Sequence, residues 1–248
     1  MKIDDGLFVG EFDLPEGSIQ WGEKMIILKI SPEKYSFKLL CASEQKIDGL
    51  TVKEWCKKYG MTAGINAGMF LPDRKTNVGY MKNFSHHNNQ RINPKYHSVA
   101  AFNPVNTSRP LFMIFDSDEK DIRIIIKDYN TVVQNLRLIK RPGKNRWSRQ
   151  QKKWSEAALG QDKDGNVLFI FSQVPLSMYE FNRYLLKLPI GITTAQHLEG
   201  GAEASLYLSH GGREIDISGS LEAGFNGDHK GSFAFSVPNV IGVIKSAQ

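Results

Sequence analysis

Short runs of apolar residues, either alternating with polar ones or continuous, dominate the chain and predict β-strands. Gly, Pro, Asn and Asp punctuate these runs. Asp162–Gly165 and Ser209–Gly212 predict hairpins, because glycine tolerates the positive φ of tight turns. The predicted strands are 25–30, 35–41, 98–102, 111–115, 122–126, 131–138, 156–160, 167–172, 205–208, 213–217 and 240–245.

Two segments have the apolar spacing of helices instead. Each begins with a capping box, in which a Ser or Thr and a Glu three residues later satisfy N–H groups of the first turn. Thr51 begins the first helix, which stops at Gly60, and Ser177 begins the second, which stops before Pro189. The pattern predicts an α+β fold, with a mixed, largely antiparallel sheet core and a few flanking helices.

The length of 248 residues fits one domain of this class. We place it at residues 25–248, after an N-terminal extension of residues 1–24, because no Pro-, Gly- or Ser-rich linker interrupts it. No apolar run approaches the roughly 18–20 residues that cross a bilayer, so we expect no transmembrane segment. The first residues lack the apolar core of a signal peptide, which leaves a cytosolic protein or a trimmed export signal as alternatives.

The basic charge is concentrated in one segment. The chain carries a net charge of +6, and residues 140–153 alone hold seven basic and no acidic residues. Trp147 lies within this segment and Trp154 follows it. Cationic and aromatic side chains together suit a sugar phosphate or single-stranded nucleic acid, but a solvated loop has the same composition.

Cysteine and histidine give little functional information. Cys41 and Cys56 fall on predicted buried positions, as two free thiols or as a disulfide in an oxidising compartment. His86 and His87 are adjacent, and neighbouring side chains rarely reach one ion. We therefore expect a solvated loop there, and neither a metal nor a cofactor.

A parallel between the two helices points to a candidate site. Each is followed by a short apolar run and then by a polar residue beside glycine: Asn66 before Gly68, and Glu199 before Gly200 and Gly201. Glycine lets the backbone turn sharply and lets a ligand approach closely. If both strands lie in one sheet, these two side chains face one cleft.

Three segments in order carry a family resemblance. Asn66–Phe70, Ala158–Asp162 and His197–Ser205 resemble the motifs of the phosphodiester glycosidase domain family, which includes the lysosomal uncovering enzyme and many exported bacterial proteins. The resemblance extends from about residue 25 to residue 245. The family's Asp before Gly-Gly is Glu199 here, and an Arg often found before its central strand is Glu156.

The resemblance implies hydrolysis of the bond between an anomeric carbon and a phosphodiester oxygen. This chemistry needs a carboxylate to activate water or to stabilise oxocarbenium charge. Glu199 is the candidate, with Glu203 or Asp162 as the second carboxylate, and no strong general acid is required because phosphate is a good leaving group. The alternatives are that Glu199 stabilises a turn and that Asp162 serves its hairpin.

Further residues are candidates for contacting the substrate. Asn66 hydrogen-bonds a sugar hydroxyl or caps a strand end, and Gln134 and Arg137 match a family segment before the active-site loop, with Arg137 as the anion partner. Lys82 is a weaker cation candidate. The remaining candidates are Gly68, Gly200, Gly201 and Ser205, although the altered sequence between Gly201 and Ser205 leaves open whether Ser205 takes the family serine's place.

The sequence thus predicts a carbohydrate-active hydrolase acting on a glycosyl phosphodiester in an envelope glycan or glycolipid. The family's mostly exported members imply a periplasmic or cell-envelope location. The alternative is a domain of the same fold that binds anionic glycans without turnover. A nucleic-acid partner is not expected, because the rest of the chain is close to neutral and contains no recognised nucleic-acid module. The oligomeric state stays open.

Overall fold

The computed structural model describes residues 1–14, 24–219 and 234–246, which form three antiparallel β-sheets with a few helices. The fold is α+β and forms a single domain, as predicted. The large sheet has the strand order β1 (Lys2–Asp4), β2 (Leu7–Asp13), β3 (Lys24–Ile30), β14 (Val167–Leu176), β13 (Trp154–Asp162), β15 (Ile192–Gly200), β11 (Arg137–Lys140) and β12 (Lys144–Asn145).

The other two sheets have five strands each. The second sheet has the order β7 (His86–Asn89), β6 (Met81–Asn83), β10 (Tyr129–Asn135), β8 (Ser98–Pro104) and β9 (Phe112–Asp116). The third has the order β17 (Arg213–Ser218), β16 (Ser205–His210), β5 (Ala63–Asn66), β18 (Asn239–Lys245) and β4 (Tyr35–Cys41). The helices are α1 (Ala42–Gln45), α2 (Val52–Lys58), α3 (Ile122–Asp128), α4 (Met178–Leu185) and a 3₁₀ turn, η1 (Gly201–Glu203).

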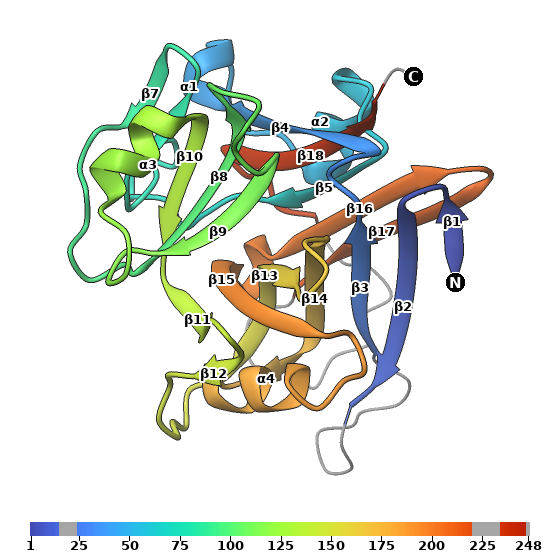
Figure 1. Ribbon diagram of the computed structural model, residues 1–248. Helices are drawn as coiled ribbons and strands as arrows, with labels where there is room; N and C mark the ends of the chain where they lie inside the picture. Colours follow the sequence, from blue (N-terminus) through green and yellow to red (C-terminus); the bar gives the residue numbers. More distant parts are fainter. Residues whose placement is uncertain (15–23, 220–233, 247–248) are drawn as a thin grey trace.

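The three sheets meet around one apolar core. The ring of Phe37 on β4 lies 4.8 Å from that of Phe112 on β9 and 6.2 Å from that of Phe169 on β14, measured between centroids, so all three sheets contribute. Helix α4 covers a second core on the other face of the large sheet, while α1 and α2 lie at the opposite end of the molecule (Figure 1). Burial on both faces explains why β14 is a nearly continuous apolar run, and β13 beside it is buried along almost its whole length.

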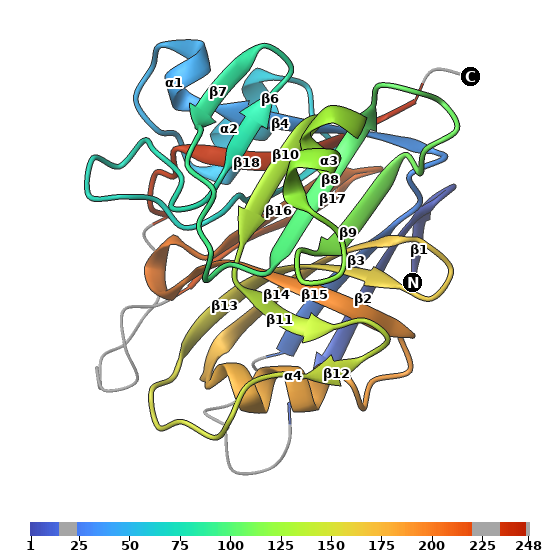
Figure 2. The same cartoon turned by 60° about the vertical axis from the view of Figure 1, so that its left-hand side comes forward.

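Both predicted capping boxes are present, at Thr51 and Ser177, and these helices are confirmed. The strand predicted at 122–126 is wrong, since this segment is helix α3, packed against β10 and β8 (Figure 2). Asp121 caps α3 by accepting a hydrogen bond from the N–H of Arg123. The run of isoleucines favours a strand by propensity, and tertiary packing overrides that preference.

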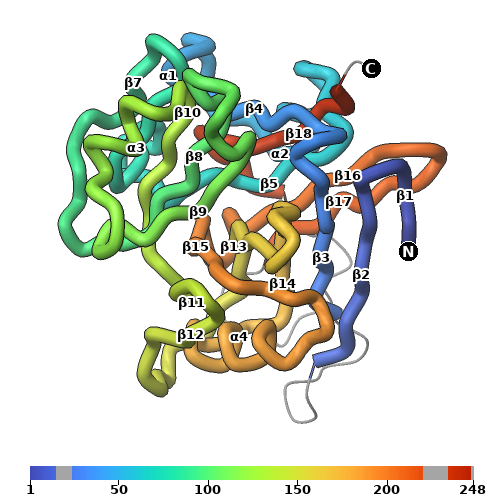
Figure 3. The backbone as a smooth tube through the Cα atoms, viewed as in Figure 1, coloured from blue at the N-terminus to red at the C-terminus, as the bar shows by residue number. Residues whose placement is uncertain are grey.

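The predicted strand 131–138 is divided at Leu136. There the chain leaves β10 of the second sheet and enters β11 of the large sheet, as the backbone trace shows (Figure 3). The expected loop at His86 is also wrong, because His86–Asn89 is the edge strand β7. In the expected N-terminal extension, β1 pairs with β2 and β2 pairs with β3, so the large sheet begins before residue 25.

The two cysteines are both free and buried, one on β4 and one on α2. Burial raises the pKa of each thiol, to about 12 for Cys56, so both stay protonated near neutral pH. None of the helices in the described part of the chain is long and apolar enough to cross a membrane.

Candidate active site

A hydrogen bond joins the two segments that the sequence singles out. Asn66 ends β5, and its Oδ1 accepts from the backbone N–H of Ser205 at 2.9 Å. The Ser205 hydroxyl in turn donates to the carbonyl of Glu203 at 3.1 Å. The condition that both strands lie in one sheet is not met, because β5 and β15 belong to different sheets. They are brought together by β16, which follows the Gly200–Gly201 turn and pairs with β5.

A β-bulge sets the direction of Glu199. Ala157 on β13 pairs with Glu199 and Ala158 pairs with His197, so Leu198 is one extra residue on β15. Directly paired residues share a face of a sheet and consecutive residues alternate. Ala157 belongs to the core shared by the three sheets and Ala158 to the core under α4. The bulge therefore turns Glu199 to the side of the second and third sheets, opposite to His197.

The carboxyl of Glu199 is largely desolvated. Burial raises its pKa to about 7, against the opposing effects of the His197 charge and of the Gly200 N–H, which donates to Glu199 Oε1 at 3.2 Å. The negative charge of Glu203 adds to the rise. The charge of Glu199 also contributes to a raised pKa of Tyr96, behind burial as the main cause. A carboxyl that changes charge near neutral pH suits proton transfer.

Arg74 supplies a cation beside this turn, and the sequence analysis missed it. Its Nη1 lies 3.9 Å from Glu203 Oε1, and its guanidinium lies 5.3 Å from the centre of the Phe70 ring. The side chain is 54% exposed, so this charge is available to a ligand. Asp73 holds the loop by accepting from the N–H groups of Lys75 and Thr76. The available signal was its position four residues after the Phe that ends the first motif.

Gln134 and Lys82 have other partners. Gln134 Oε1 accepts from the N–H of Asn93, and its Nε2 donates to the carbonyls of Asn93 and Tyr96, so it orders the segment that carries Tyr96. Lys82 Nζ donates to the carbonyl of Ile126 near the end of α3, at 2.6 Å. Both side chains thus serve the second sheet and its loops.

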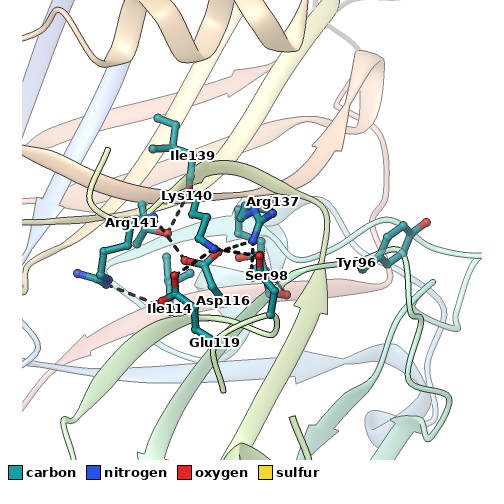
Figure 4. Close-up of polar contacts among 12 residues, drawn as sticks. Tyr96, Ser98, Ile114, Asp116, Glu119, Arg137, Ile139, Lys140 and Arg141 are labelled. Atoms are coloured by element: carbon teal, nitrogen blue, oxygen red, sulfur yellow. Dashed lines mark hydrogen bonds and ion pairs between the residues drawn. The ribbon is translucent and has the colours of Figure 1, made fainter. Parts of the chain in front are cut away.

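Arg137 is already paired with acidic residues. Its Nη1 donates to Asp116 at 2.9 Å and to Asp118 at 2.6 Å, and its side chain is only 10% exposed. Lys140 joins the same cluster, 2.9 Å from Asp118, and Tyr96 stands apart from it (Figure 4). Two carboxylates balance the guanidinium charge. Arg137 therefore forms a buried ion pair that links β9 to β11, in place of the predicted contact with a substrate anion.

Asp162 is part of its hairpin. It is 2% exposed, accepts from the N–H groups of Asp164 and Asn166, and lies 2.7 Å from Lys29 Nζ. The structure thus gives it the hairpin role that the sequence left as an alternative. Gly68 has φ +68, and a Cβ there would lie 2.1 Å from the Asn77 Oδ1 atom, so only glycine fits.

Asn66 itself is 1% exposed, and its Nδ2 is buried without a partner. Two surface hollows lie elsewhere, one beside Phe112 and Asn166 and the other beside His97 and Asp118. Within the described residues, no group of His, Cys, Asp or Glu side chains is arranged to hold a metal ion. The candidate site is therefore the Gly200–Gly201 turn with Glu199, Glu203 and Arg74, and Asn66 supports it from β5.

The sequence model of the phosphodiester glycosidase family matches residues 59–244, which is more than half of the chain. The chain belongs to the phosphodiester glycosidase family. Its fold is similar to the catalytic domain of zebrafish N-acetylglucosamine-1-phosphodiester alpha-N-acetylglucosaminidase, auto-inhibited by its pro-peptide, with a TM-score of 0.63, 14% identity, and coverage of 97% of this chain and 82% of that one.

Two further solved structures are similar in fold. A hypothetical protein from Synechocystis has a TM-score of 0.65 and 15% identity over 97% of this chain and 62% of that chain. A Burkholderia pseudomallei protein described as exported has a TM-score of 0.59 and 10% identity over 90% of this chain and 74% of that chain. None of the curated proteins matches the sequence. At these identities the structural likeness shows the fold alone.

The departures of this chain from the family motifs have structural counterparts. Glu199 keeps a carboxylate before Gly-Gly, and the backbone N–H of Ser205 donates to Asn66 while its hydroxyl donates to the carbonyl of Glu203. Glu156, at the position where the family often has Arg, is buried in direct contact with His197. The missing arginine is therefore replaced by a Glu–His pair.

Proposed function

We propose that this member of the phosphodiester glycosidase family hydrolyses a glycosyl phosphodiester and that Glu199 is its catalytic carboxylate. The observation that carries the proposal is the desolvated carboxyl of Glu199, with a pKa of about 7, at the Gly-Gly turn that Asn66 ties to β5. Glu203 and Arg74 lie at the same turn. Family membership supports a hydrolase of this class.

In the proposed reaction, ionised Glu199 accepts a proton from the water that attacks the anomeric carbon. The bond from this carbon to the phosphate oxygen breaks, and the phosphate monoester leaves with the bonding electrons. Phosphate is a good leaving group, so the step does not depend on a strong general acid. Arg74 contacts the phosphate oxygens, for which a guanidinium is well suited.

We propose an envelope glycan or glycolipid as the substrate, and a location in the periplasm or cell envelope. The support is that one protein of similar fold is described as exported and that another is named as a glycosidase of a sugar phosphodiester. The substrate we expect is a sugar joined through its anomeric oxygen to a phosphodiester.

The test is release of free sugar from glycosyl phosphodiesters, beginning with the methyl phosphodiester of N-acetylglucosamine 1-phosphate. We expect release by the wild-type protein and at least a roughly hundredfold lower rate for Glu199→Gln, as for loss of a proton-transfer group. Glu33→Gln makes the same chemical change at an exposed position and should keep the wild-type rate. A Glu199→Gln variant as active as wild type would overturn the proposal.

The second candidate is an anionic-glycan-binding protein without turnover. The buried Glu156 at a position often held by Arg in the family favours it, because an arginine has been lost from a phosphate-handling fold. It predicts that wild type and Glu199→Gln bind a glycosyl phosphodiester polymer equally and that neither releases sugar.

A further inference from the structure

A buried acid–base pair lies directly behind the candidate site, on the face of the large sheet opposite to Glu199. Glu156 on β13 is 1% exposed and His197 on β15 is 3% exposed. Glu156 Oε1 contacts His197 Nδ1, and Glu156 Oε2 accepts from the indole N–H of Trp154 at 2.7 Å. Both carboxylate oxygens are therefore occupied, which a buried carboxylate requires.

The same group of side chains packs against the Gly-Gly turn. Glu156 pairs across the sheet with Gly200, and the Trp154 ring occupies the space of a side chain there. A Cβ on Gly200 would lie 2.2 Å from Trp154 Cδ1. The N–H of Gly200 is the donor to Glu199 Oε1. Trp154, Glu156 and His197 thus fix the peptide that holds the candidate catalytic carboxylate.

The pair also supplies charge close to Glu199. Desolvation lowers the pKa of His197, but the proximity of Glu156 outweighs it and raises the pKa, so His197 holds a positive charge that the Glu156 carboxylate balances. The His197 charge favours the ionised form of Glu199, while Glu156 and Glu203 disfavour it. Tyr96 is also close enough for the Glu199 charge to add to its raised pKa, behind burial as the main cause. The His197 effect is the largest of those from neighbouring side chains.

We propose that Trp154, Glu156 and His197 form a positioning triad for Glu199, holding the Gly200 peptide against its carboxylate and placing a cation behind it. The inference rests on the proposed function, because it takes Glu199 as the carboxylate that reacts. None of the three side chains is assigned a contact with the substrate.

The decisive variant is His197→Asn, which removes the cation and keeps a side chain able to donate to Glu156. The titration of Glu199 is followed by carbon-13 NMR of labelled glutamate carboxyl groups, with its signal assigned by its loss in Glu199→Gln. Without the cation, we expect the Glu199 midpoint to rise by roughly half a pH unit or more. The double variant Glu156→Gln/His197→Asn removes both charges and should show a smaller rise.

The kinetic readout separates positioning from general destabilisation. His197→Asn should lower kcat at pH 7 by about twofold or more with KM little changed, and kcat should recover as the pH rises and Glu199 ionises again. His210→Asn, a histidine on the hairpin of β16 and β17, is the matched control and should change neither readout.

An unchanged Glu199 midpoint in a folded His197→Asn protein would overturn the inference. If His197→Asn does not fold, the double variant decides, because it replaces the buried charges by neutral hydrogen-bonding groups. The His197 effect on Glu199 exceeds the opposing Glu156 effect, so a midpoint above the wild-type value would support the inference and one at or below the wild-type value would contradict it. A shifted midpoint without sugar release by the wild-type protein would refute the proposed function and support the electrostatic coupling.

Discussion

At the scale of single residues, the candidate site is held in an arrangement that costs stability. Glu199 has a pKa of about 7 in the folded protein, against an ordinary value of 4.5. Between these pH values the folded state binds more protons than the unfolded chain, so the free energy of unfolding falls as the pH rises through this window. Above pH 7 the full cost of the buried carboxylate is present.

Glu199→Gln should therefore stabilise the protein at pH 8 and leave its stability unchanged near pH 4. From the raised pKa, the gain at pH 8 is on the order of 2–3 kcal/mol in the free energy of unfolding. Urea denaturation of both proteins at the two pH values measures it. Equal stability at pH 8 would show that Glu199 is not desolvated, and Glu33→Gln is the control that should change neither value.

The hydrogen bond from the N–H of Ser205 to Asn66 connects the first and last motifs, and substitution of Asn66 tests its importance. Asn66→Ala leaves the buried N–H of Ser205 without its acceptor, which costs about 1–3 kcal/mol, and it should also lower sugar release because the turn loses its anchor. Asn106→Ala removes a similar bond, to the N–H of Ser108, at an exposed position. Thermal denaturation should show a clearly larger loss for Asn66→Ala than for this control.

At the scale of elements, local signals predicted much of the fold. The capping boxes at Thr51 and Ser177 specify helix starts within a few residues, and hairpin signals such as Asp162–Gly165 depend on turn chemistry alone. Helix α3 could not be predicted in this way, because its isoleucines favour a strand and only the packing of Ile122 and Ile125 onto the second sheet decides otherwise.

The close packing of the turn after β15 against Trp154 can be tested by substitution. Gly200→Ala should destabilise the protein by about 1–3 kcal/mol, because its Cβ meets the Trp154 ring. Gly211→Ala has open space around it and only the strain of φ +58, for about 1 kcal/mol. In a double-mutant cycle, Trp154→Ala should make Gly200→Ala nearly neutral in unfolding free energy. Additive effects would contradict the close packing of this pair.

At the scale of the whole molecule, tertiary contacts give several basic side chains partners that lie far away in the sequence. The basic segment 140–153 looks like a patch in the sequence, but Arg141 donates to Gln161 at 3.0 Å and Lys153 pairs with Glu180 at 3.0 Å. Arg137 pairs with acids from a different sheet. Such non-local pairs leave no local sequence signal, and the pairing of Arg74 with Glu203 leaves none either, although the place of Arg74 just after the first motif could have pointed to it.

Because Lys140, Arg141 and Lys153 of this segment already contact other parts of the protein, we expect weak binding to nucleic acid. At physiological salt, fluorescence anisotropy with a single-stranded oligonucleotide should give a Kd no tighter than about 10⁻⁵ M, within the range of non-specific binding. A submicromolar Kd with a steep dependence on salt, lost when the lysines and arginines of 140–153 are neutralised, would favour a nucleic-acid-binding protein instead.

The most direct measurement is the pH dependence of sugar release from a glycosyl phosphodiester by wild type and by Glu199→Gln. We expect the wild-type kcat/KM to rise with pH to a plateau, with a midpoint about the pKa of 7 of the Glu199 carboxyl, because the ionised form takes the proton from water. The variant should be at least roughly a hundredfold slower at every pH. A variant that keeps the wild-type rate and the same pH midpoint would contradict the assignment of Glu199 as the catalytic carboxylate.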